Sequence, residues 1–340
     1  MNQFQTNILH KLKHQKSTTA KQLSLDLYVG LRTVQRVLSE LVGQGLVYQI
    51  GSSKNTNYQL SNLGTLLYPI NPESDLAEDR LQNPIIYFNS DIFDWLSGFQ
   101  FDLIELERLQ NSAKKYQNKL QTTTPELKKK ELERLVIEFS WKSSSFEGDT
   151  YTLLETVNLL QNNIKNTSKS SEDAQIILNH KKALEFVFQN TGYFKVISIK
   201  KIQELHNLLI FDLGVQTGFR KGGVGILGSL YQPIDNPHII VEMMEKFCGL
   251  INRTESYFAK AMLVGLLVSY VQPFEDGNKR TSRLLANAIL HSLHLPLLSY
   301  RNTTIEDYRN SVLGFYEQNS IVLFKNIFVE QIEFCANHYF

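Results

Sequence analysis

The sequence has few cysteines and no long hydrophobic segment. Its two cysteines, Cys248 and Cys335, each stand in an apolar helical context without the spacing of a metal site. This excludes a disulfide framework and indicates core thiols in a reducing compartment. The longest apolar run, residues 261–271, is too short to cross a bilayer, and the polar N-terminus has no signal-peptide pattern. We therefore expect a cytoplasmic protein without a membrane partner.

Charge is balanced over the whole chain but unevenly distributed along it. The 340 residues include 35 Lys/Arg and 34 Asp/Glu, and 42% of them are hydrophobic, which is enough for the cores of two domains. The first 70 residues hold seven basic and two acidic side chains, so the remainder of the chain is net negative. A positive segment before a mildly acidic body predicts different partners for the two ends.

The N-terminal segment has the pattern of two helices joined by a tight turn. A helix over 20–27 follows the capping residues Ser17, Thr18 and Thr19, a second helix spans 32–43, and two strand-like runs follow at 46–50 and 58–60. This order resembles a winged helix-turn-helix over residues 1–66. If the segment binds double-stranded DNA, the expected contacts are Arg32, Thr33, Gln35, Arg36 and, on the wing, Lys54. A protein-interaction or homodimerisation module of the same fold is the alternative.

The rest of the chain is mainly helical in pattern. Residues 67–114 contain Pro69, Pro72 and Pro84 and predict a helical connector, and residues 115–340 predict a helical domain. The segment 257–271 is apolar nearly all round, as is typical of a buried central helix. His180 and His206 lie in helical segments, and we interpret both as structural histidines rather than ligands.

Directly after the apolar helix, residues 272–283 read Gln-Pro-Phe-Glu-Asp-Gly-Asn-Lys-Arg-Thr-Ser-Arg. A glycine turn that opens a helix can point free backbone N–H groups at a phosphate, and Arg280 and Arg283 lie three residues apart on one helical face. The carboxylate of Asp276 suits Mg²⁺ that bridges nucleotide phosphates. These features predict a site for a nucleoside triphosphate with Mg²⁺, and the family resemblance described next identifies the nucleotide as ATP.

The segment resembles the signature of the Fic family, His-x-Phe-x-Asp/Glu-Gly-Asn-Gly/Lys-Arg-x-x-Arg, with Gln272 where the family has its catalytic histidine. The resemblance spans about residues 115–340. It implies an all-α, mainly helical Fic fold with a small β-hairpin flap, and transfer of AMP from ATP to a Ser, Thr or Tyr hydroxyl of an unknown target protein. The implied roles are a catalytic site at Gln272, Asn278 and Arg280, a metal ligand at Asp276, and phosphate-binding groups at Gly277, Asn278, Lys279, Arg280 and Arg283.

A second family motif is Ser/Thr-x-x-x-Glu-Gly/Asn on an inhibitory helix, which Ser143, Glu147 and Gly148 match. The resemblance implies that Glu147 pairs with Arg283 and denies it to the γ-phosphate of ATP. On the residues alone, the same segment is equally a helix that ends at a glycine C-cap. A third resemblance is the flap, a hairpin that docks the target by strand addition, for which the matching residues are Val224, Gly225, Ile226, Leu227 and Gly228. A plain surface hairpin is the alternative there.

Two positions depart from the pattern of most family adenylyltransferases. Glutamine at 272 cannot accept a proton near neutral pH, and loss of a general base costs about 10²–10⁴ in rate. Gln272 is either an engineered substitution that traps a complex or the natural residue of an ATP-binding pseudoenzyme that regulates through its winged helix. Lys279 replaces the commoner glycine and also occurs in a family branch that phosphorylates its target, although that branch differs at the position of Gly277. We therefore expect an autoinhibited adenylyltransferase scaffold, with phosphoryl transfer as the second hypothesis.

Overall fold

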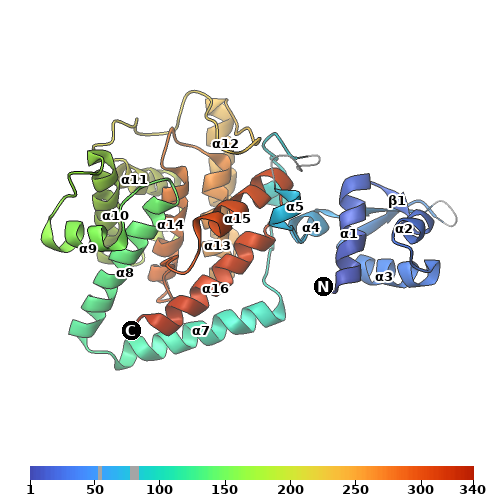
Figure 1. Ribbon diagram of the computed structural model, residues 1–340, viewed down its shortest axis with the longest axis horizontal. Coiled ribbons are helices and arrows are strands. Elements are labelled where there is room, and N and C mark those ends of the chain that lie inside the picture. Colours follow the sequence, from blue (N-terminus) through green and yellow to red (C-terminus); the bar gives the residue numbers. More distant parts are fainter. Residues whose placement is uncertain (53–55, 77–83) are drawn as a thin grey trace. The chain divides into compact units, whose positions relative to one another are not determined.

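The computed structural model describes the chain except for residues 53–55 and 77–83 (Figure 1). The chain forms two compact units, each described by itself below. The first comprises Met1–Ile86, Gly228–Tyr231 and Asn310–Phe324, and the second comprises Tyr87–Leu227, Gln232–Arg309 and Lys325–Phe340. The predicted domain limits 1–66, 67–114 and 115–340 stay predictions. Within the described residues, no helix combines the length and apolarity needed to cross a membrane.

The first unit begins with three helices and a small antiparallel sheet. The elements are α1 (Gln3–Gln15), β1 (Thr18–Thr19), α2 (Ala20–Asp26), α3 (Leu31–Gly43), β2 (Val47–Ile50), β3 (Asn57–Leu60), α4 (Asn62–Leu66) and α5 (Pro72–Asp75). The strand order is β1-β3-β2, and β2 pairs with β3 in a register that places Val47 opposite Leu60. The helix-turn-helix and the following strand pair thus lie where the sequence predicts them, to within one residue. The winged-helix assignment itself stays a prediction.

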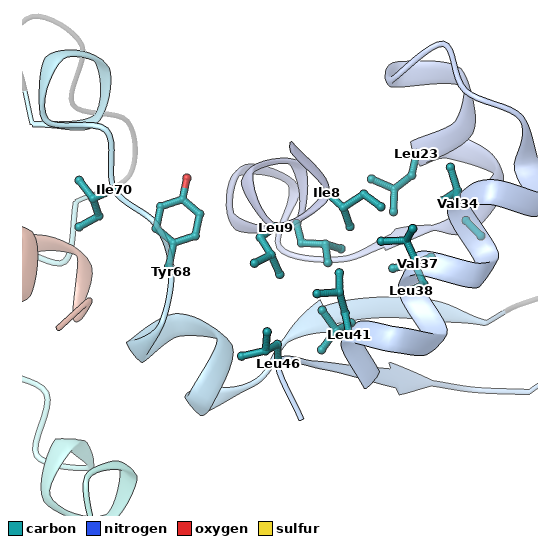
Figure 2. Close-up of a cluster of buried hydrophobic side chains, with 13 residues drawn as sticks. Ile8, Leu9, Leu23, Val34, Val37, Leu38, Leu41, Leu46, Tyr68 and Ile70 are labelled. Carbon is teal, nitrogen blue, oxygen red and sulfur yellow. The ribbon is translucent and has the colours of Figure 1, made fainter. Parts of the chain in front are cut away.

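Local capping and an apolar core account for these elements. The side chain of Asn2 accepts a hydrogen bond from the N–H of Gln5 at the start of α1, and Thr19 caps α2 in the same way. Figure 2 shows how the buried side chains of α1, α2 and α3 point toward one another, including Ile8, Leu23 and Leu38. This segment therefore buries an apolar core of its own.

The regular elements of the second unit are helices, joined by turns and irregular segments, within its described residues. Its helices are α6 (Ile92–Trp95), α7 (Leu103–Thr122), α8 (Pro125–Ser145), α9 (Leu153–Asn162), α10 (Ser171–Gln189), the 3₁₀ turn η2 (Tyr193–Lys195), α11 (Ile199–Leu209), α12 (Pro237–Arg253), α13 (Tyr257–Val271) and α14 (Asn278–Ser292). Helices α15 (Ile305–Gln318) and α16 (Val322–His338) contribute residues to both units. The mainly helical fold predicted from the sequence is confirmed.

The core of the second unit is built around α13 and α14, which pack along each other. From Ala261 to Val271 every residue of α13 is buried, as its all-round apolar pattern predicts. Helix α14 is also buried over most of its length, although it begins with polar residues. The loop between these two helices therefore starts and ends on a rigid base.

The predicted hairpin flap is wrong in its secondary structure. Residues 221–231 form turns and irregular backbone, and the segment's nearest strand-like contact is an isolated bridge between Tyr87 and Gln232. The glycines at 222, 223, 225 and 228 weaken any strand in this segment. A strand also needs a neighbouring strand for its backbone hydrogen bonds. Among the described residues, this segment has no such neighbour apart from the bridge at Gln232.

Candidate active site

The loop between α13 and α14 starts and ends with a residue of left-handed backbone conformation. Gln272 closes α13 with φ 52°, and Gly277 precedes α14 with φ 76°. A Cβ atom on Gly277 would lie 3.4 Å from Cγ2 of Ile210 and 3.5 Å from Nε2 of His206. Glycine meets both the conformational and the packing demand at this position without strain.

Asn278 and Phe274 hold the loop in shape. The side-chain oxygen of Asn278 accepts a hydrogen bond from the N–H of Phe274, and its amide donates to the carbonyl of the same residue, both at 2.9 Å. Phe274 is fully buried, and its ring stacks on His206 with centroids 3.6 Å apart and planes 6° apart. The loop is therefore anchored in the core on the side away from the solvent.

His206 supports the loop as a neutral side chain. Its Nε2 lies 2.9 Å from the carbonyl oxygen of Asp276 and donates a hydrogen bond to it. Burial lowers the pKa of His206 to about 4, so the ring is uncharged near pH 7. This agrees with the structural role predicted for His206, and it places that role directly behind the loop.

Arg220 ties the segment before α12 to this loop, a role that the sequence did not indicate. Its Nε donates to the carbonyl of Gln272 at 2.6 Å, and its backbone N–H donates to the carbonyl of Pro273 at 3.0 Å. Its two remaining guanidinium nitrogens donate to the carbonyls of Gly222 and Ile234. A buried arginine thus satisfies four backbone acceptors.

Helix α14 presents an open, positively polarised start to this loop. No side chain among the described residues caps its N-terminus, so its first N–H groups and the helix dipole favour an anion there. Arg280 is buried, its Nη2 pairs with the Asp276 carboxylate, and its Nη1 has no hydrogen-bond partner within the described residues. An unpaired buried donor beside an open helix start is suited to a phosphate.

A cavity of about 120 Å³ opens in front of this helix start. Ligand pockets usually measure roughly 300–1,000 Å³, so this cavity is small for a nucleotide. Its lining consists of Glu147, residues 224–227, Gln272 and residues 275–280. The structure thus brings together the predicted catalytic position, the phosphate loop, most of the predicted flap and the glutamate of the second motif.

Glu147 lies in this cavity between two cations. Its Oε1 is 3.0 Å from Nη1 of Arg283, and its Oε2 is 3.1 Å from Nζ of Lys279. Burial alone would raise the pKa of Glu147, but the charges of Arg283 and Lys279 hold it at about 2. The carboxylate is therefore ionised at neutral pH. The predicted contact between Glu147 and Arg283 is present, and the one with Lys279 was not predicted.

Arg283 is fully buried and has further partners. Its Nε donates to Oγ of Ser143 at 2.9 Å, its Nη2 donates to the carbonyl of Ser143 at 2.8 Å, and its Nη1 also donates to the hydroxyl of Tyr308 at 2.9 Å. Burial opposes its charge, but the facing Tyr308 and Glu147 raise the pKa of Arg283 above its ordinary value. Four contacts thus fix this guanidinium, and Glu147 makes one of them.

His180 contacts Ser143, and no pattern in the sequence predicted this contact. Its Nε2 lies 3.0 Å from Oγ of Ser143, and its Nδ1 lies 2.9 Å from the carbonyl of Ile176. Burial lowers the pKa of His180 to about 3, so the ring is neutral, with Nδ1 donating to the carbonyl and Nε2 accepting from the hydroxyl. His180 is structural, as predicted, but its partner belongs to the second motif.

Gln272 occupies the predicted catalytic position as a satisfied, buried amide. Its Nε2 donates to the carbonyl of Ser269 at 2.6 Å, and it lines the cavity. A carboxamide is not a proton acceptor near neutral pH. The described residues that line the cavity include no histidine, and their ionisable oxygens belong to Glu147, Glu275 and Asp276.

The residues present fit a magnesium ion only when a nucleotide supplies further ligands. Asp276 has a side chain that is 63% exposed, at the edge of the cavity. The described residues contain no group of three or more His, Cys, Asp or Glu that could hold a metal alone. Mg²⁺ typically uses one or two carboxylates together with substrate phosphates and water, which this arrangement allows.

The residues predicted for DNA lie on a different part of the chain. Arg32, Thr33, Gln35 and Arg36 are all exposed on α3, while Val34 on the same helix is buried. Arg36 forms an ion pair with Glu40 one turn further on. Lys54 lies outside the described residues.

Comparison with known proteins relates part of the chain to one family. Residues 196–290 match the family model described as Fic/DOC family. The protein adenylyltransferase Fic of Drosophila mojavensis is 28% identical over 156 residues, which are 44% of this chain and 30% of that protein. The protein of the same name from Drosophila melanogaster is 29% identical over 156 residues, 44% of this chain and 31% of that protein. The chain spans about a third of the length of these curated relatives.

Solved structures share the fold. Fic-1 from C. elegans superimposes with a TM-score of 0.58 and 19% identity, covering 69% of this chain and 71% of that chain. A Fic family protein from Desulfovibrio desulfuricans G20 has a TM-score of 0.58 and 18% identity, covering 70% of this chain and 74% of that chain. The chain therefore contains a Fic domain with the Fic fold, homologous to the protein adenylyltransferases Fic.

Proposed function

We propose that this protein binds ATP with Mg²⁺ at the start of α14 and is a protein adenylyltransferase whose activity is held low by Glu147 and by Gln272. The observation that supports it best is the position of Glu147, a carboxylate on Arg283 and Lys279 at an open helix N-terminus. Two cations, an unpaired donor of Arg280 and free backbone N–H groups suit the phosphates of a nucleotide. Asp276 would hold the metal, which would neutralise phosphate charge.

The transfer chemistry requires a proton acceptor at position 272. A target hydroxyl oxygen attacks the α-phosphorus, the new O–P bond forms as the bond to the β-phosphate oxygen breaks, and pyrophosphate leaves. The hydroxyl proton must pass to a base. Glutamine does not take it, so the protein retains phosphate-binding groups and lacks the base. We therefore expect the protein to bind ATP better than it uses it.

The inhibitory role that we propose for Glu147 follows from its place in the cavity. A γ-phosphate that took the place of the Glu147 carboxylate would use the same N–H of Nη1, since Nε, one N–H of Nη2 and the other N–H of Nη1 are bonded to Ser143 and Tyr308. Two negative groups cannot share the position without strong repulsion. Removing Glu147 therefore frees one donor and enlarges the cavity without disturbing the remaining contacts of Arg283.

Labelling with ATP tests this function. The variant that combines Gln272→His with Glu147→Gly is incubated with ATP labelled at the α-phosphate or at the γ-phosphate, and self-modification or target modification is counted. We expect covalent label from the α-position. Label from the γ-position alone would favour the kinase hypothesis over adenylylation. Absence of label from both positions, with ATP still bound, would favour the pseudoenzyme.

A second proposed function concerns α3 in the first unit. The observation that favours it is the exposed set Arg32, Thr33 and Gln35 on one face of a helix whose other face is buried. Such a helix, preceded by a tight turn, can lie in the major groove of double-stranded DNA. Titration of duplex DNA at low and high salt tests the proposal. If no duplex binds at low salt, the alternative of a protein-docking module is preferred.

A further inference from the structure

The two cations that contact Glu147, Arg283 and Lys279, differ in the number of other contacts that fix their side chains. Arg283 keeps three hydrogen bonds that do not involve Glu147, two to Ser143 and one to Tyr308. Its side chain is 0% exposed. Removal of the Glu147 carboxylate would therefore leave Arg283 in place, as a fixed part of the site.

Among the described residues, the side chain of Lys279 has Glu147 as its hydrogen-bond and ion-pair partner. Its side chain is 26% exposed, and Oε2 of Glu147 is the hydrogen-bond acceptor of its Nζ among the described residues. The ammonium is a flexible point charge on a four-carbon stem, so it can follow whichever anion is nearby. Lys279 is the second residue of α14 and one of the residues that line the cavity.

Lys279 therefore faces two competing anions. In the structure its partner is the Glu147 carboxylate, and a phosphate at the start of α14 would offer another. An interaction that stabilises the empty site opposes binding, whereas an interaction with the bound phosphate favours it. Arg283 has the same two partners, but it does not need to move between them.

We propose that Lys279 is a latch that holds Glu147 in the empty site and passes to the nucleotide phosphates when ATP enters. The inference rests on the proposed function, and it adds a residue that sets the strength of autoinhibition. A Fic domain with glycine at this position would lack the second contact of its glutamate. Replacing Lys279 thus removes two opposing effects: the inhibition it supports through Glu147 and the phosphate contact it makes after Glu147 is displaced.

A double-mutant cycle on nucleotide affinity separates the two effects. Binding of α,β-methylene-ATP with Mg²⁺ is measured by calorimetry on the full chain with Gln272 retained, in four forms: unchanged, Lys279→Gln, Glu147→Gly and both. Without Glu147, we expect Lys279→Gln to weaken binding about 2- to 5-fold, the range of a partly exposed ion pair. With Glu147 present, the loss of nucleotide affinity caused by Lys279→Gln should be smaller by about the same factor, or should become a gain. The reason is that the substitution also removes the contact through which Lys279 holds Glu147 in the empty site.

Two further variants complete the experiment. Lys279→Arg retains the charge and should keep the behaviour of the unchanged chain. Lys200→Gln is the matched control, because Lys200 is exposed at the second residue of α11, and it should have no effect on either background. An equal loss from Lys279→Gln with and without Glu147 would overturn the latch. Failure of the Glu147→Gly protein to bind the nucleotide at all would contradict the proposed function instead.

Discussion

Two pairs of arginines, one in each unit, differ in how much the protein has built around them. Arg280 and Arg283 on α14 are buried, and their partners come from α8, the turn that follows it, α15 and the loop before α14. Arg32 and Arg36 on α3 are exposed, and Arg36 has a partner on its own helix, Glu40. The α14 pair thus depends on tertiary structure, and the α3 pair does not.

The difference shows what a buried charge implies. Taking an arginine out of water costs several kcal/mol unless paired charges and hydrogen bonds offset the loss. The contacts of Arg283 with Ser143, Tyr308 and Glu147 meet that demand, and one of these partners, Glu147, lines the cavity. An exposed arginine needs no such arrangement, so its surroundings say little about its ligand.

The largest effect is expected at the missing base. In the Glu147→Gly protein, Gln272→His should raise nucleotide transfer by about 10²–10⁴, because an imidazole can take the hydroxyl proton. Histidine also adopts the left-handed conformation of position 272 more readily than most residues. Transfer is measured as covalent α-phosphate label per minute. Gln272→Asn, which also tolerates this backbone, is the matched control, and a similar gain from it would contradict a role as base.

The second-largest effect is expected on the free energy of unfolding, which should depend more on the buried arginines of α14 than on the exposed arginines of α3. Arg283→Ala removes the partner of Glu147 and three hydrogen bonds, and we expect a loss of roughly 3 kcal/mol in the free energy of unfolding, the lower end for a broken buried pair, since Glu147 is a quarter exposed. Arg32→Ala, on an exposed helix face, should change it by less than about 0.5 kcal/mol. Urea unfolding of both variants makes the measurement. Equal losses would mean that the burial of Arg283 has no energetic consequence.

Removal of the inhibitory glutamate should raise the transfer rate less than restoration of the base at position 272 does. On the Gln272→His background, Glu147→Gly should raise transfer about tenfold or more, because it frees an Nη1 donor of Arg283 for the γ-phosphate. Adding Arg283→Ala should cancel the gain, since ATP needs the same guanidinium. If labelling is the same with and without Glu147, the segment from Ser143 to Gly148 is only a capped helix end.

The ion pairs of Glu147 should also appear in the pH dependence of stability. The pKa of Glu147 is about 2 in the folded state against an ordinary value of 4.5, so the carboxylate stabilises the fold fully above pH 4.5. That contribution is lost as the pH falls from 4.5 toward 2. The unchanged protein should therefore lose more stability over this range than Glu147→Gln does. A difference between the two proteins that does not vary with pH would contradict the ion-pair account.

The smallest effect is expected on α3. If the helix binds duplex DNA, the logarithm of the binding constant should fall with the logarithm of salt concentration by about 0.9 per phosphate contact. Arg32→Ala should reduce that slope by about one contact. Arg36→Ala should change it less, because Glu40 already neutralises part of its charge. Fluorescence anisotropy across a salt series measures both slopes.

The sequence predicted those features that depend on local patterns. The capped helix α2, the all-round apolar α13 and the glycine turn before α14 all follow from residue types within a few positions. The contact between Glu147 and Arg283 was also predicted, but through the resemblance of two motifs to a family. The hairpin predicted around residues 224–228 was wrong, because a segment with several glycines becomes a strand only where a partner strand is available, and the role of these residues in target docking stays a prediction.

Contacts between residues that lie far apart along the chain could be identified only from the tertiary structure. The glycine turn before α14 was predicted from adjacent residues, because Gly277 readily adopts the left-handed conformation that the turn requires. The contacts of Arg220 with the loop, of His180 with Ser143, and of Lys279 with Glu147 join residues from different helices and loops. No spacing predicts them, because burial of the whole helical core brings these elements together and leaves each charged group with the partners that remain within reach.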